Sequence, residues 1–298
     1  MIKRTLYFGN PAYLKTQNEQ LVVERRDTGE VKQIPIEDIG ILILDYQQIT
    51  VTQAVMAKLL ANNTALIICD ETHHPVGMLL NLDGNNLQSH RFKAQIEASV
   101  PLKKQLWQQT VAQKIYNQAV GLTKQMAEAR LLFNLAREVK SGDSENHEAQ
   151  AATYYWKHLF PQFLEFRRER FGPPPNNLLN YGYAILRAMV ARSLVGSGLL
   201  PTLGIHHRNQ YNSYCLADDI MEPYRPFVDQ VVCGIIRQNG KFLEMTPSMK
   251  VELLKIPQMD VIIKGQKSPM FTAIQRTTSS LSKCFEGTAK KILYPQME

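Results

Sequence analysis

Cysteine is scarce in this sequence of 298 residues. The four cysteines, Cys69, Cys215, Cys233 and Cys284, lie far apart, and no two of them form a C-x-x-C pair. This spacing argues against a disulfide framework and against a zinc site built from thiolates. We therefore expect a reduced chain that works in the cytoplasm.

Long apolar runs are also missing. The most apolar long stretch, residues 186–205, is interrupted by Arg187 and Arg192, and the basic residues near the N-terminus are not followed by an apolar segment. We expect neither a signal peptide nor a membrane-spanning helix. Glycine and proline are few (16 and 15), and no tract repeats, so collagen-like, disordered and solenoid chains are excluded.

The charge of the chain is unevenly distributed. Thirty-four Lys and Arg residues against 27 Asp and Glu residues give a net charge of +7, and the first 90 residues hold more acidic than basic side chains. The positive excess therefore belongs to the remaining two-thirds of the chain. An excess of this kind suits a polyanionic partner such as nucleic acid, although a need for solubility alone would also explain it.

Residues 1–85 have the pattern of a small β-rich domain. Short segments rich in β-branched and aromatic residues are separated by turn-forming residues, and this favours a sandwich-like arrangement of strands. The predicted strands are Ile2–Phe8, Gln20–Arg25, Val31–Ile36, Ile39–Leu44, Ala65–Cys69 and Val76–Leu82, with one helix over Thr52–Ala61.

The pattern changes to a helical period after the polar segment 81–86, and residues 86–298 are predicted to be almost wholly helical. The predicted helices cover residues 91–118, 122–140, 145–170, 177–196, 215–238, 247–255 and 270–291. The expected fold class is therefore α+β, with an N-terminal β-rich domain (1–85) and a large all-α-helical domain (86–298).

One predicted helix places an acidic residue on its buried face. Glu148 lies within about 40° of Ala152, Tyr155 and Leu159 around the helix, so it is expected to face the interior with them. A buried carboxylate needs a cation, a hydrogen-bond network or a metal, because burying a lone charge is costly. The pattern alone leaves two interpretations open: a structural ion pair with an arginine, or a catalytic group.

A second cluster combines histidines with carboxylates. His206 and His207 precede Asp218, Asp219 and Glu222, and the spacing of Asp218 and Glu222 places both on one helix face. Nitrogen and oxygen ligands without a thiolate suit Mn²⁺ or Mg²⁺ better than structural zinc. The alternative is structural, since Asp218 also favours the positive end of a helix and adjacent histidines often have packing roles.

A proline follows this cluster directly. Pro223 removes a backbone donor within the helical pattern, so a kink or a new helix start is predicted just after Glu222. Such a kink exposes backbone and can turn the carboxylate of Glu222 toward a cleft.

Four motifs then occur in an order that is specific to one family. They are Ile67–Asp70 followed by Pro75–Gly77, the helix opening Asn146–Ala149, the helix Asn176–Leu186, and Gly198–Pro201 leading through Gly204–His207 to Leu216–Glu222. Together they resemble CRISPR-associated protein 1, the integrase and nuclease family that inserts new spacers into CRISPR arrays. The resemblance covers nearly the whole chain, and residues Asp219–Pro226 are most similar to the type II branch.

The resemblance implies a metal site. In this family one Glu, one His and one further carboxylate bind a divalent ion, and motif by motif these places fall on Glu148, His207 and Glu222. The expected cofactor is Mg²⁺ or Mn²⁺. His206 is the rival for the histidine place, because only the register from Gly204 favours the later of the two adjacent histidines.

The third place also has alternatives. Some family members have Asp there, so Asp218 or Asp219 could contribute. The kinked pair formed by Glu222 and Pro223 favours Glu222.

The implied activity is that of a metal-dependent DNA endonuclease and integrase. A DNA 3′-hydroxyl attacks a phosphodiester in the CRISPR repeat and displaces another 3′-hydroxyl, without hydrolysis. Two alternatives are a nuclease that acts on branched or single-stranded DNA and a non-catalytic scaffold that binds nucleic acid.

The resemblance implies double-stranded DNA as partner, both the prespacer and the CRISPR repeat. The positive helical domain would contact the phosphate backbone, which positions a duplex but carries little sequence information. The candidate contacts are Arg208 and the cluster of Arg167, Arg168 and Arg170, for which a solvated helix end is the ordinary alternative.

The family further implies an assembly. A homodimer would form through the N-terminal β-rich domain, and CRISPR-associated protein 2 would bridge two dimers. For a type II member, the effector nuclease and a further adaptation protein are additional candidate partners.

Overall fold

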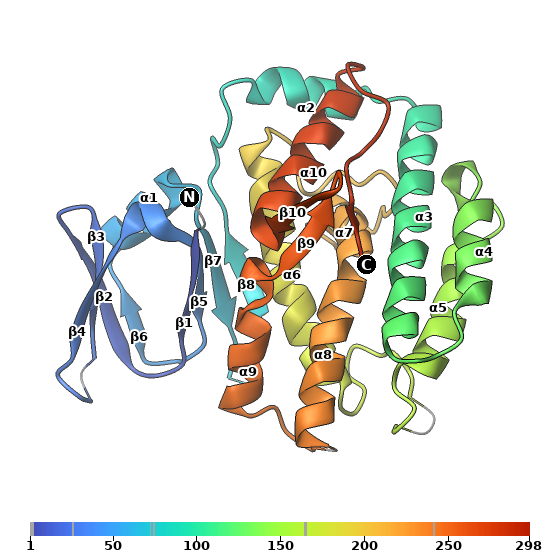
Figure 1. The fold of residues 1–298 in the computed structure, drawn as a ribbon. Coiled ribbons are helices and arrows are strands. Elements are labelled where there is room, and N and C mark those ends of the chain that lie inside the picture. The colour runs from blue at the N-terminus through green and yellow to red at the C-terminus, as the bar shows by residue number, and fades with distance from the viewer. Residues whose placement is uncertain (1–2, 26, 72, 74, 164–165, 241) are drawn as a thin grey trace.

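Most of the strands gather at one side of the molecule, and helices make up most of the rest (Figure 1). The computed structural model describes residues 3–25, 27–71, 73, 75–163, 166–240 and 242–298. A strand-rich N-terminal region precedes a mostly helical C-terminal region, so the predicted α+β fold class is confirmed. The domain boundary between residues 85 and 86 stays a prediction, and Ile2, the first residue of a predicted strand, lies outside the described residues.

Two four-stranded sheets make up the N-terminal region, with the strand orders β1-β5-β7-β8 and β4-β3-β2-β6. The strands are β1 (Arg4–Phe8), β2 (Ala12–Gln17), β3 (Gln20–Glu24), β4 (Val31–Pro35), β5 (Ile39–Leu44), β6 (Ile49–Val51), β7 (Ala65–Cys69) and β8 (Pro75–Leu79), and helix α1 (Gln53–Ala61) precedes β7. The sequence pattern did not predict β2 and β6. β6 has only three residues, too few to give a recognisable strand pattern. It is a strand because its backbone pairs with β2.

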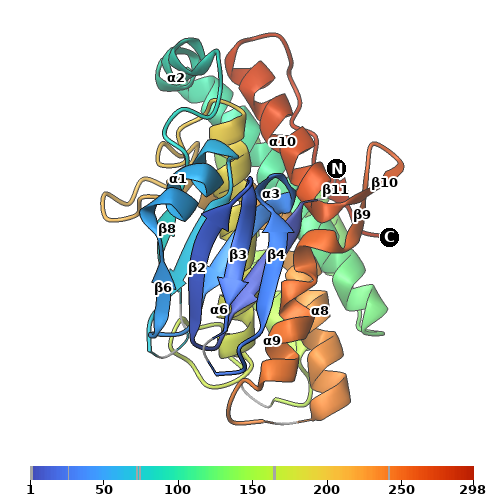
Figure 2. The same ribbon diagram turned by 90° about the vertical axis from the view of Figure 1, so that its left-hand side faces the viewer.

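The two sheets pack face to face (Figures 1 and 2). Leu14 and Leu21 of one sheet and Leu42 and Leu66 of the other are fully buried in a common apolar core, to which α1 contributes Leu59. Alternate residues along a strand point to opposite faces of a sheet, so only one residue in two can enter this core. The predicted sandwich-like arrangement is thereby confirmed.

Strand β5 belongs to two cores. Leu42 enters the core between the sheets, whereas Ile41 and Ile43 enter the core of the helical region. A strand buried on both faces has a nearly continuous apolar sequence, and this explains the run Ile-Gly-Ile-Leu-Ile-Leu at Ile39–Leu44. One face of this sheet therefore packs against the other sheet, and its opposite face packs against the helices.

The helices are α2 (Gln88–Ile96), α3 (Val100–Lys124), α4 (Arg130–Glu138), α5 (His147–Leu159), α6 (Asn176–Gly196), α7 (Cys215–Met221), α8 (Arg225–Asn239), α9 (Pro247–Leu254) and α10 (Met270–Phe285). Helix α6 runs through the middle of this region (Figure 1), and most of its residues are buried. A helix that is apolar all round is typical of a central position. A Cβ atom on Gly182 would lie 2.5 Å from a methyl group of Val228, so glycine lets α6 and α8 approach closely.

The predicted helix 145–170 is too long. Helix α5 ends at Leu159 because Pro161 disfavours a helical conformation at Phe160, whose φ of −122° and ψ of 68° lie outside the helical region. Arg167, Arg168 and Arg170 therefore do not lie at a helix end. They belong to the irregular segment that leads from α5 to α6.

The prediction of an almost wholly helical C-terminal region is wrong at a third, small sheet. Its strands are β9 (Asp260–Ile263), β10 (Gln266–Pro269) and β11 (Pro295–Gln296), with β9 in the middle. Lys264 and Gly265 join β9 to β10 with φ angles of +51° and +69°, the geometry of a two-residue hairpin turn. The β-branched run before Lys264 is the signal that a helical interpretation overlooks. The helix predicted over 270–291 ends at Phe285.

A buried aspartate joins three of the helices. Asp229 of α8 accepts hydrogen bonds from Tyr155 of α5 at 2.9 Å and from Tyr183 of α6 at 2.5 Å. Burial raises the pKa of Asp229 to about 7, although the two tyrosine hydroxyls, Arg225 and Arg168 all act in the opposite direction. The protonated carboxyl is therefore the form that the folded protein prefers at mildly acidic pH.

This raised pKa predicts a pH dependence of stability. An aspartate ionises near pH 3.9 in the unfolded chain, so the folded protein binds one proton more between about pH 4 and pH 7, and its free energy of unfolding falls as the pH rises through this window. Asp229→Asn should remove that fall, a relative gain of about 4 kcal/mol between pH 4 and pH 8. Urea unfolding over this pH range, with the exposed Asp83→Asn as control, measures it. Parallel curves for wild type and Asp229→Asn would contradict the assignment.

Candidate active site

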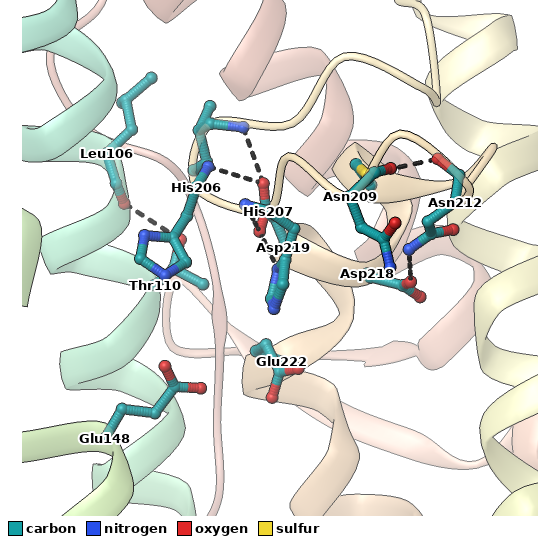
Figure 3. Close-up of polar contacts among 12 residues, drawn as sticks. Leu106, Thr110, Glu148, His206, His207, Asn209, Asn212, Asp218, Asp219 and Glu222 are labelled. Atoms are coloured by element: carbon teal, nitrogen blue, oxygen red, sulfur yellow. Dashed lines mark hydrogen bonds and ion pairs between the residues drawn. The ribbon is translucent and has the colours of Figure 1, made fainter. Parts of the chain in front are cut away.

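Two carboxylates from separate segments face each other in the helical region (Figure 3). Glu148 lies in the first turn of α5, and Glu222 begins the short 3₁₀ turn Glu222–Tyr224 between α7 and α8. The ammonium group of Lys114 on α3 lies between them, 2.7 Å from Glu148 Oε1 and 2.6 Å from Glu222 Oε2. The guanidinium of Arg225 lies 3.1 Å from Glu222 Oε1. Two acidic charges are thus matched by two basic charges.

The start of α5 directs Glu148 inward. The carboxylate of Asp143 accepts hydrogen bonds from the backbone amides of His147 and Glu148, at 2.9 and 3.0 Å, and so satisfies amides that the first turn of a helix leaves without partners. The Glu148 side chain is 23% exposed and forms the ion pair with Lys114. The predicted inward direction of Glu148 agrees with this placement, and the cation beside it is a lysine, not an arginine.

The kink predicted from Pro223 is confirmed. Helix α7 ends at Met221, the 3₁₀ turn follows, and α8 starts at Arg225. Asn117 of α3 holds the turn by donating a hydrogen bond of 2.7 Å to the carbonyl of Pro223. Burial opposes ionisation of Glu222, but Arg225 and Lys114 more than offset it, so the pKa of Glu222 is lowered. Glu222 is therefore a carboxylate ion although it is buried.

The loop that carries the histidines is held by a single buried carboxylate. Asp219 Oδ2 accepts the backbone amides of Ile205 and His206 at 2.7 and 3.0 Å. Asp219 Oδ1 accepts the amide of His207 at 3.2 Å and lies 2.5 Å from the His207 ring nitrogen Nδ1. A Cβ atom on Gly204 would lie 2.4 Å from the carbonyl oxygen of His207, so this tight loop requires glycine.

Asp219 also fixes the state of the His207 ring. Its hydrogen bond to Nδ1 raises the pKa of His207, opposed by partial burial and supported by the negative charges of Glu222 and Glu148. A carboxylate on Nδ1 orients the ring and leaves Nε2 as the nitrogen that can bind a cation. In Figure 3 the His207 ring points from Asp219 toward the space between Glu148 and Glu222.

The neighbouring histidine points elsewhere. The His206 ring stacks on Trp107 of α3, with ring centroids 4.1 Å apart and an interplanar angle of 2°. In Figure 3 its ring lies on the α3 side of the loop, whereas the His207 ring lies above Glu222. The choice of His207 over His206 stays a prediction, and this geometry supports it.

The oxygens of the two neighbouring aspartates are already occupied. Asp218 forms a paired interaction with Arg187 at 2.7 and 3.0 Å and accepts a further hydrogen bond of 2.7 Å from Asn212. Asp219 is used by the histidine loop. Of the three carboxylates predicted here, Glu222 is the one that faces Glu148.

Arginines line a cleft of about 860 Å³ beside this site. Its cationic lining side chains are Arg168, Arg170, Arg187 and Arg225. Arg168 is anchored by hydrogen bonds to the side chains of Asn176 and Asn180. The structure thus brings two of the predicted DNA contacts, Arg168 and Arg170, to one cleft, which Arg167 and Arg208 do not line.

Sequence reasoning missed two members of the site. Lys114 was not singled out, although it follows Trp107 and Val111 at helical spacing on the buried stripe of α3. A lysine on such a stripe is the signal that could have identified it. Arg225, three residues after Glu222, is a helix neighbour of that carboxylate and could have been paired with it.

The donor groups suit a divalent cation. Glu148 and Glu222 offer hard oxygen ligands and His207 a ring nitrogen, the set that Mn²⁺ and Mg²⁺ accept. The ion pairs of Lys114 show that the space between the two carboxylates holds positive charge. As the side chains lie, no three His, Cys, Asp or Glu residues in the described part of the chain are arranged to hold a metal ion, and the lysine ammonium stands between the two carboxylates.

The fold is shared with solved structures of known proteins. A casposase bound to its integration product superimposes with a TM-score of 0.81 at 20% identity, over 98% of this chain and 92% of that chain. A Cas1 protein from Thermotoga maritima gives a TM-score of 0.76 at 17% identity, over 99% of this chain and 100% of that chain. The chain therefore has the α+β fold of these casposase and Cas1 structures.

Sequence comparison specifies the family. The family model for CRISPR associated protein Cas1 matches residues 6–245. The CRISPR-associated endonuclease Cas1 of Neisseria meningitidis serogroup C (strain 8013) is 37% identical over 304 aligned positions, which cover 100% of this chain and 97% of the relative. A Cas1 endonuclease of Saccharolobus solfataricus is 28% identical over 288 positions, covering 94% and 90%. The chain belongs to the Cas1 family, and the resemblance inferred from its motifs is confirmed.

None of the helices in the described part of the chain is both long and apolar enough to cross a bilayer.

The role of Asp219 can be tested through the titration of His207. Asp219→Asn removes the negative charge on Nδ1, so the pKa of His207 should fall. NMR titration of the histidine ring signals measures this shift. Asp218→Asn is the matched control, since Asp218 contacts Arg187 and Asn212 instead of the ring. An equal fall in both variants would contradict the specific role of Asp219.

Proposed function

We propose that this chain is a metal-dependent DNA integrase of CRISPR adaptation that joins prespacer 3′-hydroxyl ends to the CRISPR repeat. The observation that carries the proposal is that Glu148, Glu222 and His207, from three separate segments, lie near one another, with the ammonium group of Lys114 between the two carboxylates. Membership of the Cas1 family supports it, and so does the likeness to a casposase whose structure contains an integration product.

The proposed reaction is a transesterification. The attacking 3′-oxygen forms a new bond to phosphorus, the bond to the departing 3′-oxygen breaks, and the proton of the attacking hydroxyl is balanced by the proton that the departing oxygen gains. The number of phosphodiester bonds is unchanged. The protein therefore needs no covalent nucleophile, only groups that align the two oxygens and neutralise the phosphate.

The chain's residues divide this work. Glu148, Glu222 and the Nε2 atom of His207 would hold an ion, Mg²⁺ or Mn²⁺, that acts as a Lewis acid and template. Asp219 orients the His207 ring through Nδ1. Arg225, which touches Glu222 and also lines the cleft, is placed to face a phosphate next to the carboxylates.

The arginine cleft is the proposed path of the DNA backbone toward the site. Arg168, Arg170, Arg187 and Arg225 line it together, and guanidinium groups suit phosphate oxygens. A solved Cas1–DNA complex shares this fold with a TM-score of 0.59 at 14% identity. Arg167 and Arg208 are outside the lining of this cleft and stay proposed contacts.

The proposed assembly follows the family. A structure described as a Cas6-RT-Cas1–Cas2 complex shares the fold with a TM-score of 0.78 at 19% identity, over 100% of this chain and 36% of that chain. We propose a homodimer, bridged to a second one by CRISPR-associated protein 2, in the cytoplasm. A type II effector and a further adaptation protein are the additional proposed partners.

The site makes a direct prediction for catalysis. Glu148→Ala and His207→Ala should each lower joining of a short donor duplex to a supercoiled, repeat-containing plasmid in Mn²⁺ at least about 100-fold, since even groups behind metal ligands cost 10- to 100-fold. Salt-sensitive DNA binding should persist. His206→Ala should be milder, because that ring stacks on Trp107. Retained joining in both main variants would refute the site, and a larger loss in His206→Ala would move the ligand to His206.

The same assay separates the competing functions. Cleavage of branched or single-stranded DNA without joining would favour a nuclease in which water replaces the 3′-hydroxyl. Binding without joining or cleavage would favour a scaffold. Joined product supports the integrase.

The arginines make a prediction for DNA binding. Removing one charge that neutralises a phosphate of duplex DNA flattens the slope of log affinity against log salt by about 0.9. Arg170→Ala and Arg208→Ala should therefore each flatten the slope by up to about one unit. Lys32→Ala on β4, whose lysine pairs with Glu30, is the control and should leave the slope unchanged. Fluorescence anisotropy at several salt concentrations measures all three, and unchanged slopes for both arginine variants would contradict the proposed contacts.

A further inference from the structure

Lys114 is set apart from the exposed lysines of this chain. Its side chain is 12% exposed, whereas those of Lys140 and Lys255, which also form ion pairs, are 65% and 61% exposed. Lys114 contacts two carboxylates at once, one from α5 and one from the 3₁₀ turn after α7. A buried ammonium that forms ion pairs with two separate segments is held in place by the fold, unlike a lysine on a solvated helix face.

The charges around Lys114 are balanced. Glu148 and Glu222 contribute two negative charges, and Lys114 and Arg225 contribute two positive charges within 3.1 Å of them. Without cations, two buried carboxylates that face each other would repel, and the loss of their hydration would destabilise the folded protein. A divalent ion entering the balanced cluster would meet a net charge near zero and, at close range, the repulsion of the ammonium group.

We propose that Lys114 is a positioning residue that takes the place of the metal before the metal binds, and that it must withdraw for the metal to enter. The inference rests on the proposed function, since it assumes that Glu148 and Glu222 bind a divalent ion. The lysine stem is flexible and carries a compact charge, so it can hold the carboxylates in place and then move away. Lys114 thus stabilises the metal-free site and lowers its affinity for metal.

The decisive variant is Lys114→Met, which keeps an unbranched, flexible side chain and removes the charged ammonium group. Calorimetric titration with Mn²⁺ should show binding at least about tenfold tighter than in wild type, because the competing cation is absent. Thermal unfolding in EDTA should occur at a lower temperature than in wild type, and Mn²⁺ should raise the melting temperature more in the variant. Lys124→Met, an exposed position on the same helix, is the control and should change none of these values.

The outcomes separate this inference from the proposed function. If wild type binds Mn²⁺ and Lys114→Met binds it equally or more weakly, Lys114 does not compete with the metal and only the present inference fails. If neither protein binds Mn²⁺, the proposed metal site is wrong, and the inference about Lys114 is wrong as well. If Lys114→Met does not fold in EDTA, Lys114→Gln, which keeps a neutral hydrogen-bond-donating NH₂ group, should show the same tightening of Mn²⁺ binding, and the absence of this tightening would overturn the inference.

Discussion

The two carboxylates of the site are partly or fully buried and need a cation beside them, and α3 supplies it. Lys114 ties the start of α5 to the turn that begins at Glu222. The same helix fixes the turn itself, because Asn117 donates to the carbonyl of Pro223. Trp107 of the same helix stacks on the ring of His206 in the histidine loop. The separation of the two site carboxylates is therefore set by one helix that is itself held in the core.

Local sequence patterns drew attention to both carboxylates, and the family resemblance then selected them from the alternatives. A helical period of 3.6 residues places Glu148 beside apolar neighbours, and a proline directly after Glu222 interrupts the helical hydrogen-bond pattern there. Both signals act within a few residues. The partner of these carboxylates lies 34 residues before Glu148 in the chain, and no local pattern links Lys114 to either of them.

The distinction between the two histidines has a different origin. His206 and His207 are adjacent, so their sequence surroundings are almost the same, and what separates them is the carboxylate of Asp219, 12 residues after His207. The strands show the same limit. Ile39–Leu44 was predicted because its own sequence is rich in β-branched residues, whereas Ile49–Val51 exists through its pairing with β2. Features that depend on a distant partner are the ones that the sequence alone does not reveal.

Arg225 connects the carboxylates to the cleft and to the core behind it. Its guanidinium contacts Glu222 and lies 4.8 Å from the centre of the Tyr183 ring, and the hydroxyl of Tyr183 donates to Asp229. Burial raises the pKa of Asp229 to about 7, so below that pH one of the carboxyl groups near Arg225 is neutral. Arg225 itself contacts Glu222 and lines the cleft. Lys114, by contrast, lies between its two carboxylates. The two cations of the site therefore differ in role: Lys114 holds the carboxylates, whereas Arg225 also faces the path proposed for DNA.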